Sequence, residues 1–249
     1  MMTARFNRPL LALALAPLAM LAACDSAEEA TDGSVEGDPV EAVAAPEGQS
    51  WSQIVAPTDQ GGFLMGNPDA PIKFVEYGAL SCSHCADFAK TAGEELRSEY
   101  VDSGRVSFEL RLVPLSSMDL PAALLVQCSA PEATIALADQ FWENQGTFFQ
   151  AAQQAGQGAF EQVNALPPEQ RMVAMGELFG MTDFFASRGI SRDQANACLA
   201  DVDKAQSFVE TAATYEVTST PTLEINGTRL TGAPTWEELE PALQRAGAR

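Results

Sequence analysis

Two cysteines separated by two residues stand where a strand-like stretch of this sequence gives way to a helical one. Residues 72–77 are mostly β-branched or aromatic, as in a short central strand. From Cys82 to Tyr100, apolar or small residues recur at helical spacing with charged residues between them. Residues 106–113 form a second strand-like stretch. The pattern predicts a β-α-β unit with two parallel strands, in which the Cys82-x-x-Cys85 motif opens the helix.

The position of Cys82 at the start of a helix predicts a reactive sulfur. Backbone N–H groups without helical partners and the positive end of the helix dipole face it, which favours thiolate over thiol. His84, two residues later, would lower the pKa of Cys82 further as a cation. A stabilised thiolate favours the reduced form, so the disulfide becomes a stronger oxidant. Cys82 is then the exposed sulfur that substrate attacks, and Cys85, one turn further on the core-facing side, is the resolving partner.

Three other interpretations of the motif fit the residues less well. Covalent haem attachment requires a histidine directly after the second cysteine, where this chain has Ala86. A zinc site requires further ligands at close spacing, and His84 is the only histidine. A purely structural disulfide across so short a loop would be strained and would stabilise little. We therefore expect no metal site and no cofactor.

The N-terminus is expected to be an export signal rather than part of the fold. Arg5 and Arg8 precede an apolar run over residues 10–22 that is short for a membrane-spanning helix. The sequence Leu21-Ala22-Ala23-Cys24 resembles a bacterial lipobox, which implies a signal peptide over residues 1–23 and lipid on Cys24. The alternative is an ordinary signal with an incidental cysteine. With Cys24 acylated, the other four of the five cysteines form an even set in an oxidising compartment.

Residues 24–50 are expected to form an acidic, disordered tether to the membrane. From Asp25 to Ser50 there are eight acidic residues, no Lys or Arg, and no aromatic residue. The formal net charge of the whole chain, −20, argues against nucleic acid as a partner, because a polyanion would be repelled.

After the β-α-β unit, residues 116–207 show several helical periods and no convincing strand, which predicts a helical insertion. A helix over residues 206–215 follows, and Asn226-Gly227 then predicts a hairpin turn before a last helix that ends near Ala246. An aromatic cluster in the insertion is expected to be core, with a substrate groove as the alternative. Its members are Phe141, Trp142, Phe148 and Phe149.

Thr220 and Pro221 lie between the penultimate helix and the hairpin. A proline that opens a strand is common and means little alone. Combined with a C-x-x-C motif at the start of the first helix, it matches the thioredoxin arrangement. The chain resembles the DsbA-like branch of the thioredoxin superfamily over about residues 60–246. The resemblance rests on Phe74-Val75-Glu76-Tyr77, Cys82-Ser83-His84-Cys85, the helical insertion, Thr218-Ser219-Thr220-Pro221-Thr222 and Ile225-Asn226-Gly227.

The resemblance implies an α/β thioredoxin fold, in which a central mixed sheet is flanked by helices and carries an all-helical insertion. Residues 51–115 and 208–249 would form the thioredoxin domain, and residues 116–207 the insertion. Pro221 would follow a cis peptide bond and lie against Cys82, leaving the Thr220 backbone free to pair with an extended substrate.

The resemblance also assigns roles to Glu76 and to the two remaining cysteines. Glu76 matches a buried acid that relays the proton of the resolving cysteine, the alternative being a partly exposed strand glutamate. Cys128 and Cys198 both fall in the expected insertion, and some relatives resemble this chain in having a second, non-catalytic bridge there. Two buried free thiols are the alternative.

The implied function is periplasmic thiol-disulfide exchange by a membrane-tethered lipoprotein of a Gram-negative-type cell. Its partners would be unfolded or reduced exported proteins and a DsbB-like membrane protein that reoxidises it. Two departures leave the direction of exchange open, because Ser83 stands where the best known members have proline and Thr220 is frequent in isomerase relatives. An isomerase or reductase of the same fold, and a tethered chaperone or metal-binding module, are the competing hypotheses.

Overall fold

The structure is a computed structural model that describes residues 35–232 and 235–249. The expected signal peptide, Cys24 and the first part of the expected tether lie outside the described residues. The elements, in chain order, are the 3₁₀ helix η1 (Trp51–Gln53), β1 (Val55–Pro57), β2 (Phe63–Met65), β3 (Ile72–Gly78), α1 (Ser83–Glu95), the π-helix η2 (Leu96–Val101), β4 (Val106–Leu112), α2 (Asp119–Val126), the 3₁₀ helix η3 (Pro131–Ala133), α3 (Thr134–Glu143), α4 (Gln145–Asn164), α5 (Pro168–Leu178), α6 (Met181–Ala186), α7 (Arg192–Ala200), α8 (Val202–Ala213), β5 (Thr222–Ile225), β6 (Thr228–Arg229) and α9 (Trp236–Arg245).

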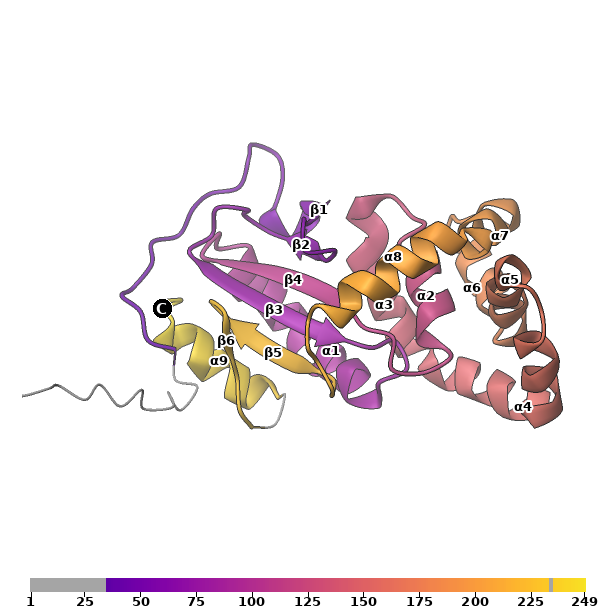
Figure 1. The fold of residues 1–249 in the computed structure, drawn as a ribbon. Coiled ribbons are helices and arrows are strands. Elements are labelled where there is room, and N and C mark those ends of the chain that lie inside the picture. The colour runs from indigo at the N-terminus through magenta and orange to yellow at the C-terminus, as the bar shows by residue number, and fades with distance from the viewer. Residues whose placement is uncertain (1–34, 233–234) are drawn as a thin grey trace, which may run out of the picture. The chain divides into compact units, whose positions relative to one another are not determined.

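The described strands form a six-stranded mixed sheet in the order β1-β2-β4-β3-β5-β6 (Figure 1). β3 and β4 are parallel and joined through α1, as the sequence pattern predicts, whereas the other neighbours are antiparallel. The expected central mixed sheet flanked by helices, with a helical insertion, is confirmed. β1 and β2 were not predicted, because three residues are too few to show a period of two.

The central strand β3 is buried on both faces, and its alternation determines where the site forms. Phe74 belongs to the large core that also contains residues of α1 and α9, whereas Val75 and Tyr77 belong to a smaller cluster with Ala212 of α8. Side chains two residues apart on a strand share a face. Glu76 therefore points to the same side as Phe74, beneath α1.

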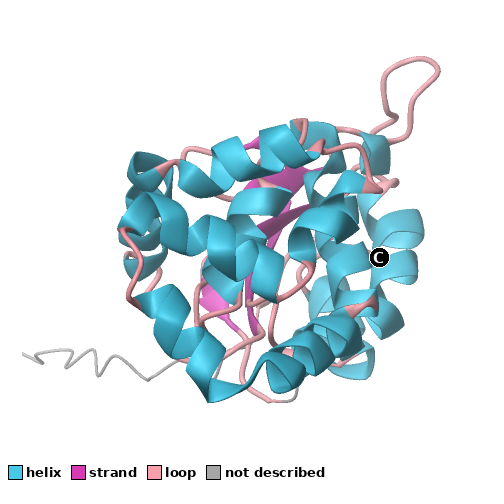
Figure 2. Cartoon of the chain, turned by 90° about the vertical axis from the view of Figure 1, so that its right-hand side faces the viewer, coloured by secondary structure: helices cyan, strands magenta, loops and turns pink. Residues whose placement is uncertain are grey.

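The insertion is entirely helical, because no strand lies in residues 113–221, all of which are described. Seen from the side of the insertion, helices lie in front of the strands (Figure 2). Phe141, Trp142 and Phe148 are buried there, and the rings of Phe141 and Phe148 stack at 4.1 Å between centroids. Three of the four aromatic residues are thus core, as expected, while Phe149 is exposed. Among the described residues, no helix has both the length and the apolar character needed to cross a membrane.

Helix α4 was missed by the sequence patterns. Its twenty residues include Gly146, Gly156 and Gly158, and Gly156 has a positive φ of 71° that kinks the helix. Glycine has low helix propensity, so the segment does not look helical when taken alone. Helix α8 also begins earlier than expected, at Val202, because the Asp201 carboxylate caps it by accepting from the backbone N–H of Lys204.

The expectation of a disordered tether is wrong for residues 35–50. These residues form no helix or strand, but they are hydrogen-bonded to the domain: the N–H groups of Gly37 and Val40 donate to carbonyls near the C-terminus, and that of Val43 donates to the Ser103 carbonyl. The Trp51 indole N–H in turn donates to the Val43 carbonyl at 2.7 Å. The acidic side chains of this segment are exposed, in keeping with its composition. Its backbone N–H groups, however, form hydrogen bonds with parts of the folded domain that are distant in sequence, which composition does not reveal.

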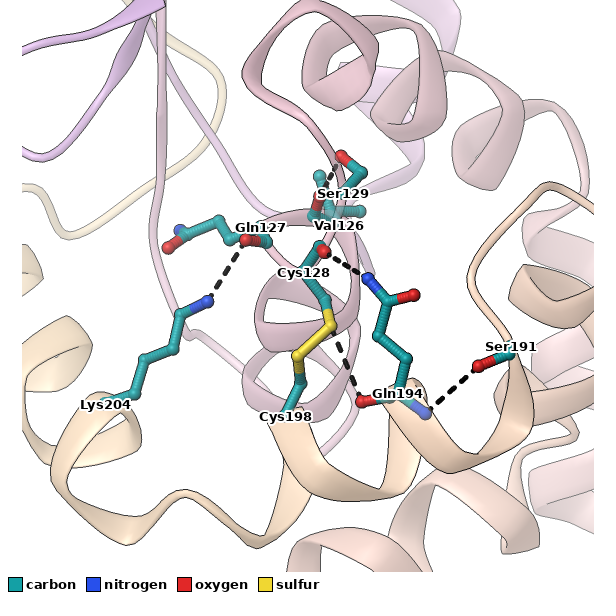
Figure 3. Close-up of a disulfide and its surroundings, with 8 residues drawn as sticks. All are labelled: Val126, Gln127, Cys128, Ser129, Ser191, Gln194, Cys198 and Lys204. Carbon is teal, nitrogen blue, oxygen red and sulfur yellow. Dashed lines mark hydrogen bonds between the residues drawn. A yellow bond between two sulfur atoms is a disulfide. The ribbon is translucent and has the colours of Figure 1, made fainter.

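Cys128 and Cys198 are joined by a disulfide, which ties the end of α2 to α7 (Figure 3). The two residues are 70 apart in sequence. Around the bridge, the Gln194 side chain donates to the Cys128 carbonyl, and Lys204 donates to the Gln127 carbonyl. The bridge therefore fastens the first helix of the insertion to one of its last.

Replacing both cysteines, in Cys128→Ser/Cys198→Ser, is expected to lower the free energy of unfolding. A closed loop of 70 residues corresponds to a loss of up to about 4 kcal/mol, through the greater chain entropy of the unfolded state. Denaturant unfolding of oxidised wild type and variant measures the difference. An unchanged midpoint and slope would show that the bridge does not restrain the unfolded chain.

Candidate active site

Cys82 occupies the N-cap position of α1. Its backbone is extended, with φ −80° and ψ 117°, and its Sγ accepts a hydrogen bond from the backbone N–H of Cys85 at 3.2 Å. The sulfur thus takes the place that a Ser or Asp oxygen fills at most helix starts. Because the strand ends at Gly78 and the helix begins at Ser83, this sulfur is held between the two elements and remains partly exposed.

The environment of Cys82 favours its thiolate and lowers its pKa to about 6. The largest cause is the hydrogen bond with the Cys85 side chain, followed by one with the Thr220 side chain and by the backbone N–H groups of Cys85 and His84, while burial opposes them. His84 itself is exposed. The contribution of His84 to the lowered pKa of Cys82 in this structure is the hydrogen bond from its backbone N–H.

Cys85 lies one turn further along α1 and is fully buried. Burial raises the pKa of its thiol, and the hydrogen bond to Cys82 and the nearby charges of Glu76 and Cys82 raise it further. The two sulfurs of the motif are thus opposite in character. One is an accessible thiolate near neutral pH, and the other is a buried thiol that keeps its proton.

Thr220 and Pro221 face Cys82 from the loop before β5. The peptide bond between them is cis, and the Cys82 thiol donates to the Thr220 carbonyl at 3.3 Å. Cys82 and Thr220 are 138 residues apart in sequence. β5 pairs with β3, and this pairing brings the loop that precedes β5 to the end of β3 from which the cysteine loop departs.

Glu76 is buried beneath α1 with 2% of its surface exposed, and its Oε1 has no hydrogen-bond partner among the described residues. Desolvation raises the pKa of this carboxyl to about 8, and the charges of Asp139 and Cys82 add to the effect while Arg97 opposes it. A carboxyl of this kind can hold or release a proton near neutral pH.

Three polar side chains of the insertion hold the loop that leads to Cys82, and sequence reasoning missed this role of all three. Trp142 Nε1 donates to the Ala79 carbonyl at 3.0 Å, and Gln145 Nε2 donates to the Leu80 carbonyl at 2.8 Å. The buried Asp119 carboxylate accepts from the backbone N–H and hydroxyl of Ser81. The sequence offers one signal, because Asp119 is the only charged residue in the otherwise apolar segment 119–126. An aspartate at the start of a helix is equally well explained as a helix cap.

Together these groups can carry out exchange between thiols and disulfides. The reaction requires one accessible sulfur that is stable as a thiolate, a second sulfur within reach, and a group that supplies or takes up the proton of the second. Cys82 and Cys85 have the first two properties in this structure, and Glu76 has a pKa suited to the third.

Comparison with known proteins gives similarity to one family over most of the chain. The family model described as thioredoxin matches residues 58–245. A protein of Rickettsia bellii, provisionally named protein-disulfide oxidoreductase, is 33% identical over 70 residues, which is 28% of this chain and only 27% of that protein. A Rickettsia prowazekii protein with the same provisional name is 29% identical over 77 residues, or 28% of its length.

Solved structures share the fold. A protein-disulfide isomerase from Novosphingobium aromaticivorans superposes with a TM-score of 0.67 at 24% identity, covering 73% of this chain and 94% of that one. The alpha-DsbA1 protein of Wolbachia pipientis superposes with a TM-score of 0.61 at 18% identity, covering 80% of this chain and 96% of that one. At these identities the likeness establishes the architecture alone.

Proposed function

This chain belongs to the thioredoxin family, and we propose that it is a thiol-disulfide oxidoreductase. It donates the Cys82–Cys85 disulfide to other proteins. The family membership rests on the match over residues 58–245. The observation that carries the proposal is the contrast between the two sulfurs, because Cys82 is stabilised as a thiolate at a helix start while Cys85 is a buried thiol.

The reaction follows from that contrast. A substrate thiolate attacks Cys82 Sγ of the disulfide, the bond to Cys85 breaks, and Cys85 departs as a thiolate that takes up a proton. A second substrate thiolate then attacks the substrate sulfur of the mixed disulfide, and Cys82 leaves as a thiolate. Two electrons pass from two substrate thiols to the protein. The low pKa of Cys82 makes it a good leaving group in this last step.

The Thr220-Pro221 loop is proposed to receive the substrate. Pro221 precedes β5, and the Thr220 carbonyl lies against Cys82. An extended peptide that paired with the Thr220 backbone would bring its own sulfur to Cys82. This geometry supports reduced, unfolded chains as substrates, since a folded substrate seldom offers an extended strand beside a thiol.

The cellular setting is proposed on the N-terminal sequence. The basic residues, the apolar run and the Leu21-Ala22-Ala23-Cys24 sequence support export to the periplasm and a lipid on Cys24. Donating a disulfide leaves the protein reduced, so a membrane redox partner of the DsbB type is proposed to reoxidise it.

The equilibrium of the Cys82–Cys85 disulfide with glutathione buffers tests the direction. We expect a potential closer to about −120 mV, as in strong oxidants, than to the roughly −270 mV of thioredoxin. The fraction oxidised is measured after acid quenching and thiol alkylation, in the Cys128→Ser/Cys198→Ser background so that one disulfide is counted. A potential near that of thioredoxin would favour a reductase, and an intermediate potential would favour an isomerase. The isomerase alternative is supported by Thr220 before the proline and by the structural similarity to the Novosphingobium protein-disulfide isomerase.

A further inference from the structure

The carboxylate of Glu76 faces a small cavity rather than a hydrogen-bond partner. The cavity has a volume of about 10 Å³ and lies between Glu76, Arg97 and Asp139. A volume of this size is at the lower limit for one water molecule, and a buried water needs two to four polar partners. The unpartnered Glu76 Oε1, the Asp139 carboxylate and the Arg97 guanidinium are such partners, while the rest of the lining is apolar.

This cavity borders a groove on the surface. Ala89, Arg97, Asp139 and Trp142 line the buried cavity, and the same four line a surface groove of about 260 Å³. The ion pair of Arg97 with Asp139 is therefore the polar part of the wall between Glu76 and solvent. Its two side chains are 30% and 22% exposed, so the pair is in contact with water and also lines the cavity.

The charges around Glu76 come from three elements. Cys82 lies at the N-cap of α1 and Cys85 in its first turn, Asp139 of α3 lines the cavity, and Arg97 of η2 is paired with Asp139. Asp139 is itself poorly solvated, since burial raises its pKa while Arg97 opposes the effect. The pair is close to neutral as a unit, and its two charges act on Glu76 with opposite signs.

We propose that Asp139 and Arg97 are positioning residues for Glu76, which determine whether it holds a proton and form the polar route by which that proton is exchanged with solvent. The inference rests on the proposed function. When Cys85 leaves Cys82 as a thiolate, the Glu76 carboxyl gives it a proton, and Glu76 regains one from water through the wall formed by the ion pair. In the reverse step Cys85 returns the proton to Glu76, and it leaves by the same route.

Titration of Glu76 in Asp139 and Arg97 variants tests the proposal with opposite signs. Asp139→Asn removes a negative charge and leaves Arg97, so the pKa of Glu76 is expected to fall by about one unit, whereas Arg97→Gln is expected to raise it by a similar amount. The double variant removes both charges and is expected to return the pKa near its wild-type value. The measurement is carboxyl NMR of the reduced protein labelled at glutamate, with Glu76→Gln identifying the resonance.

Controls separate charge from structural damage. Arg97→Lys retains the charge and is expected to leave Glu76 unchanged, and Lys90→Gln alters only the surface groove. Shifts of the same sign in both single variants, or shifts that accumulate in the double variant, would overturn the proposal.

A second readout concerns Cys85 directly. In each variant, the pH at which Cys85 resolves a Cys82 mixed disulfide at half its maximal rate is expected to move with the pKa of Glu76. A half-maximal pH that stays constant while the pKa of Glu76 moves would also overturn the inference. Because the NMR titration needs no turnover, it stands even if the protein proves inactive as an oxidase, which would reject the proposed function alone.

Discussion

Cys82→Ser is expected to reduce thiol-disulfide exchange by at least about a thousandfold, because a hydroxyl neither ionises near neutral pH nor forms a disulfide. Cys85 cannot replace it, since its sulfur is buried and keeps its proton. Oxidation of a reduced, unfolded protein by the oxidised enzyme measures the rate.

Cys85→Ser is expected to have a different consequence, namely accumulation of a mixed disulfide between Cys82 and substrate. The Cys82 thiolate still attacks a disulfide of an oxidised substrate, and the Cys85 sulfur that would release the adduct in this reverse direction of exchange is absent. Non-reducing electrophoresis and mass spectrometry identify the adduct. Cys128→Ser/Cys198→Ser is the control, which removes both sulfurs of the other disulfide and is expected to retain exchange activity. Activity of Cys82→Ser equal to that of wild type would reject the mechanism.

Glu76→Gln is expected to make the reduced protein more stable than wild type at alkaline pH. The pKa of Glu76 is raised from 4.5 to about 8 by folding, so between these values the folded state binds a proton that the unfolded state has released. The stability associated with this proton is complete below pH 4.5 and is lost as the pH rises through 8. At 1.36 kcal/mol per pH unit, the 3.5 units between 4.5 and about 8 correspond to about 5 kcal/mol.

Glutamine has nearly the same shape and no charge, so the variant should not lose this stability. Denaturant unfolding of both reduced proteins at pH 5, 7 and 9 measures the difference, which is expected to grow with pH. Asp87→Asn, which alters an exposed carboxylate of the same helix, is the control and should follow wild type. A constant difference across the three pH values would show that Glu76 does not carry a raised pKa in the fold.

The elements that local patterns predict best are those that immediately surround the motif. β3, α1 and β4 lie within a few residues of their expected bounds, and the Asn226-Gly227 hairpin is present. Each depends on a period, a turn dipeptide or a helix start that neighbouring residues specify among themselves. α4 and the short strands β1 and β2 have no such local signal, because glycine-rich and three-residue segments acquire their conformation from the surfaces that they pack against.

Within the site, the residues that were expected also have a local sequence signal, and those whose role was missed have no specific one. Cys82, Cys85, Thr220 and Pro221 were singled out by a motif and a resemblance, and the structure brings them together.

Asp119, Trp142 and Gln145 had no such signal, since each is an ordinary residue of an insertion helix until folding places it against the loop before Cys82. The strap formed by residues 35–50 was likewise hidden, because its backbone partners lie near the other end of the chain.

By itself, then, the sequence determined the sulfur pair, the helix start that activates one of the sulfurs, and the α/β order of the domain, because these depend on interactions within a few residues. Only the tertiary structure decided which carboxylate is left without a partner, which ion pair separates it from solvent, and which insertion residues hold the cysteine loop. Burial and electrostatic coupling between Glu76, Arg97 and Asp139 are properties of distances in the folded chain, and no spacing along the sequence specifies them.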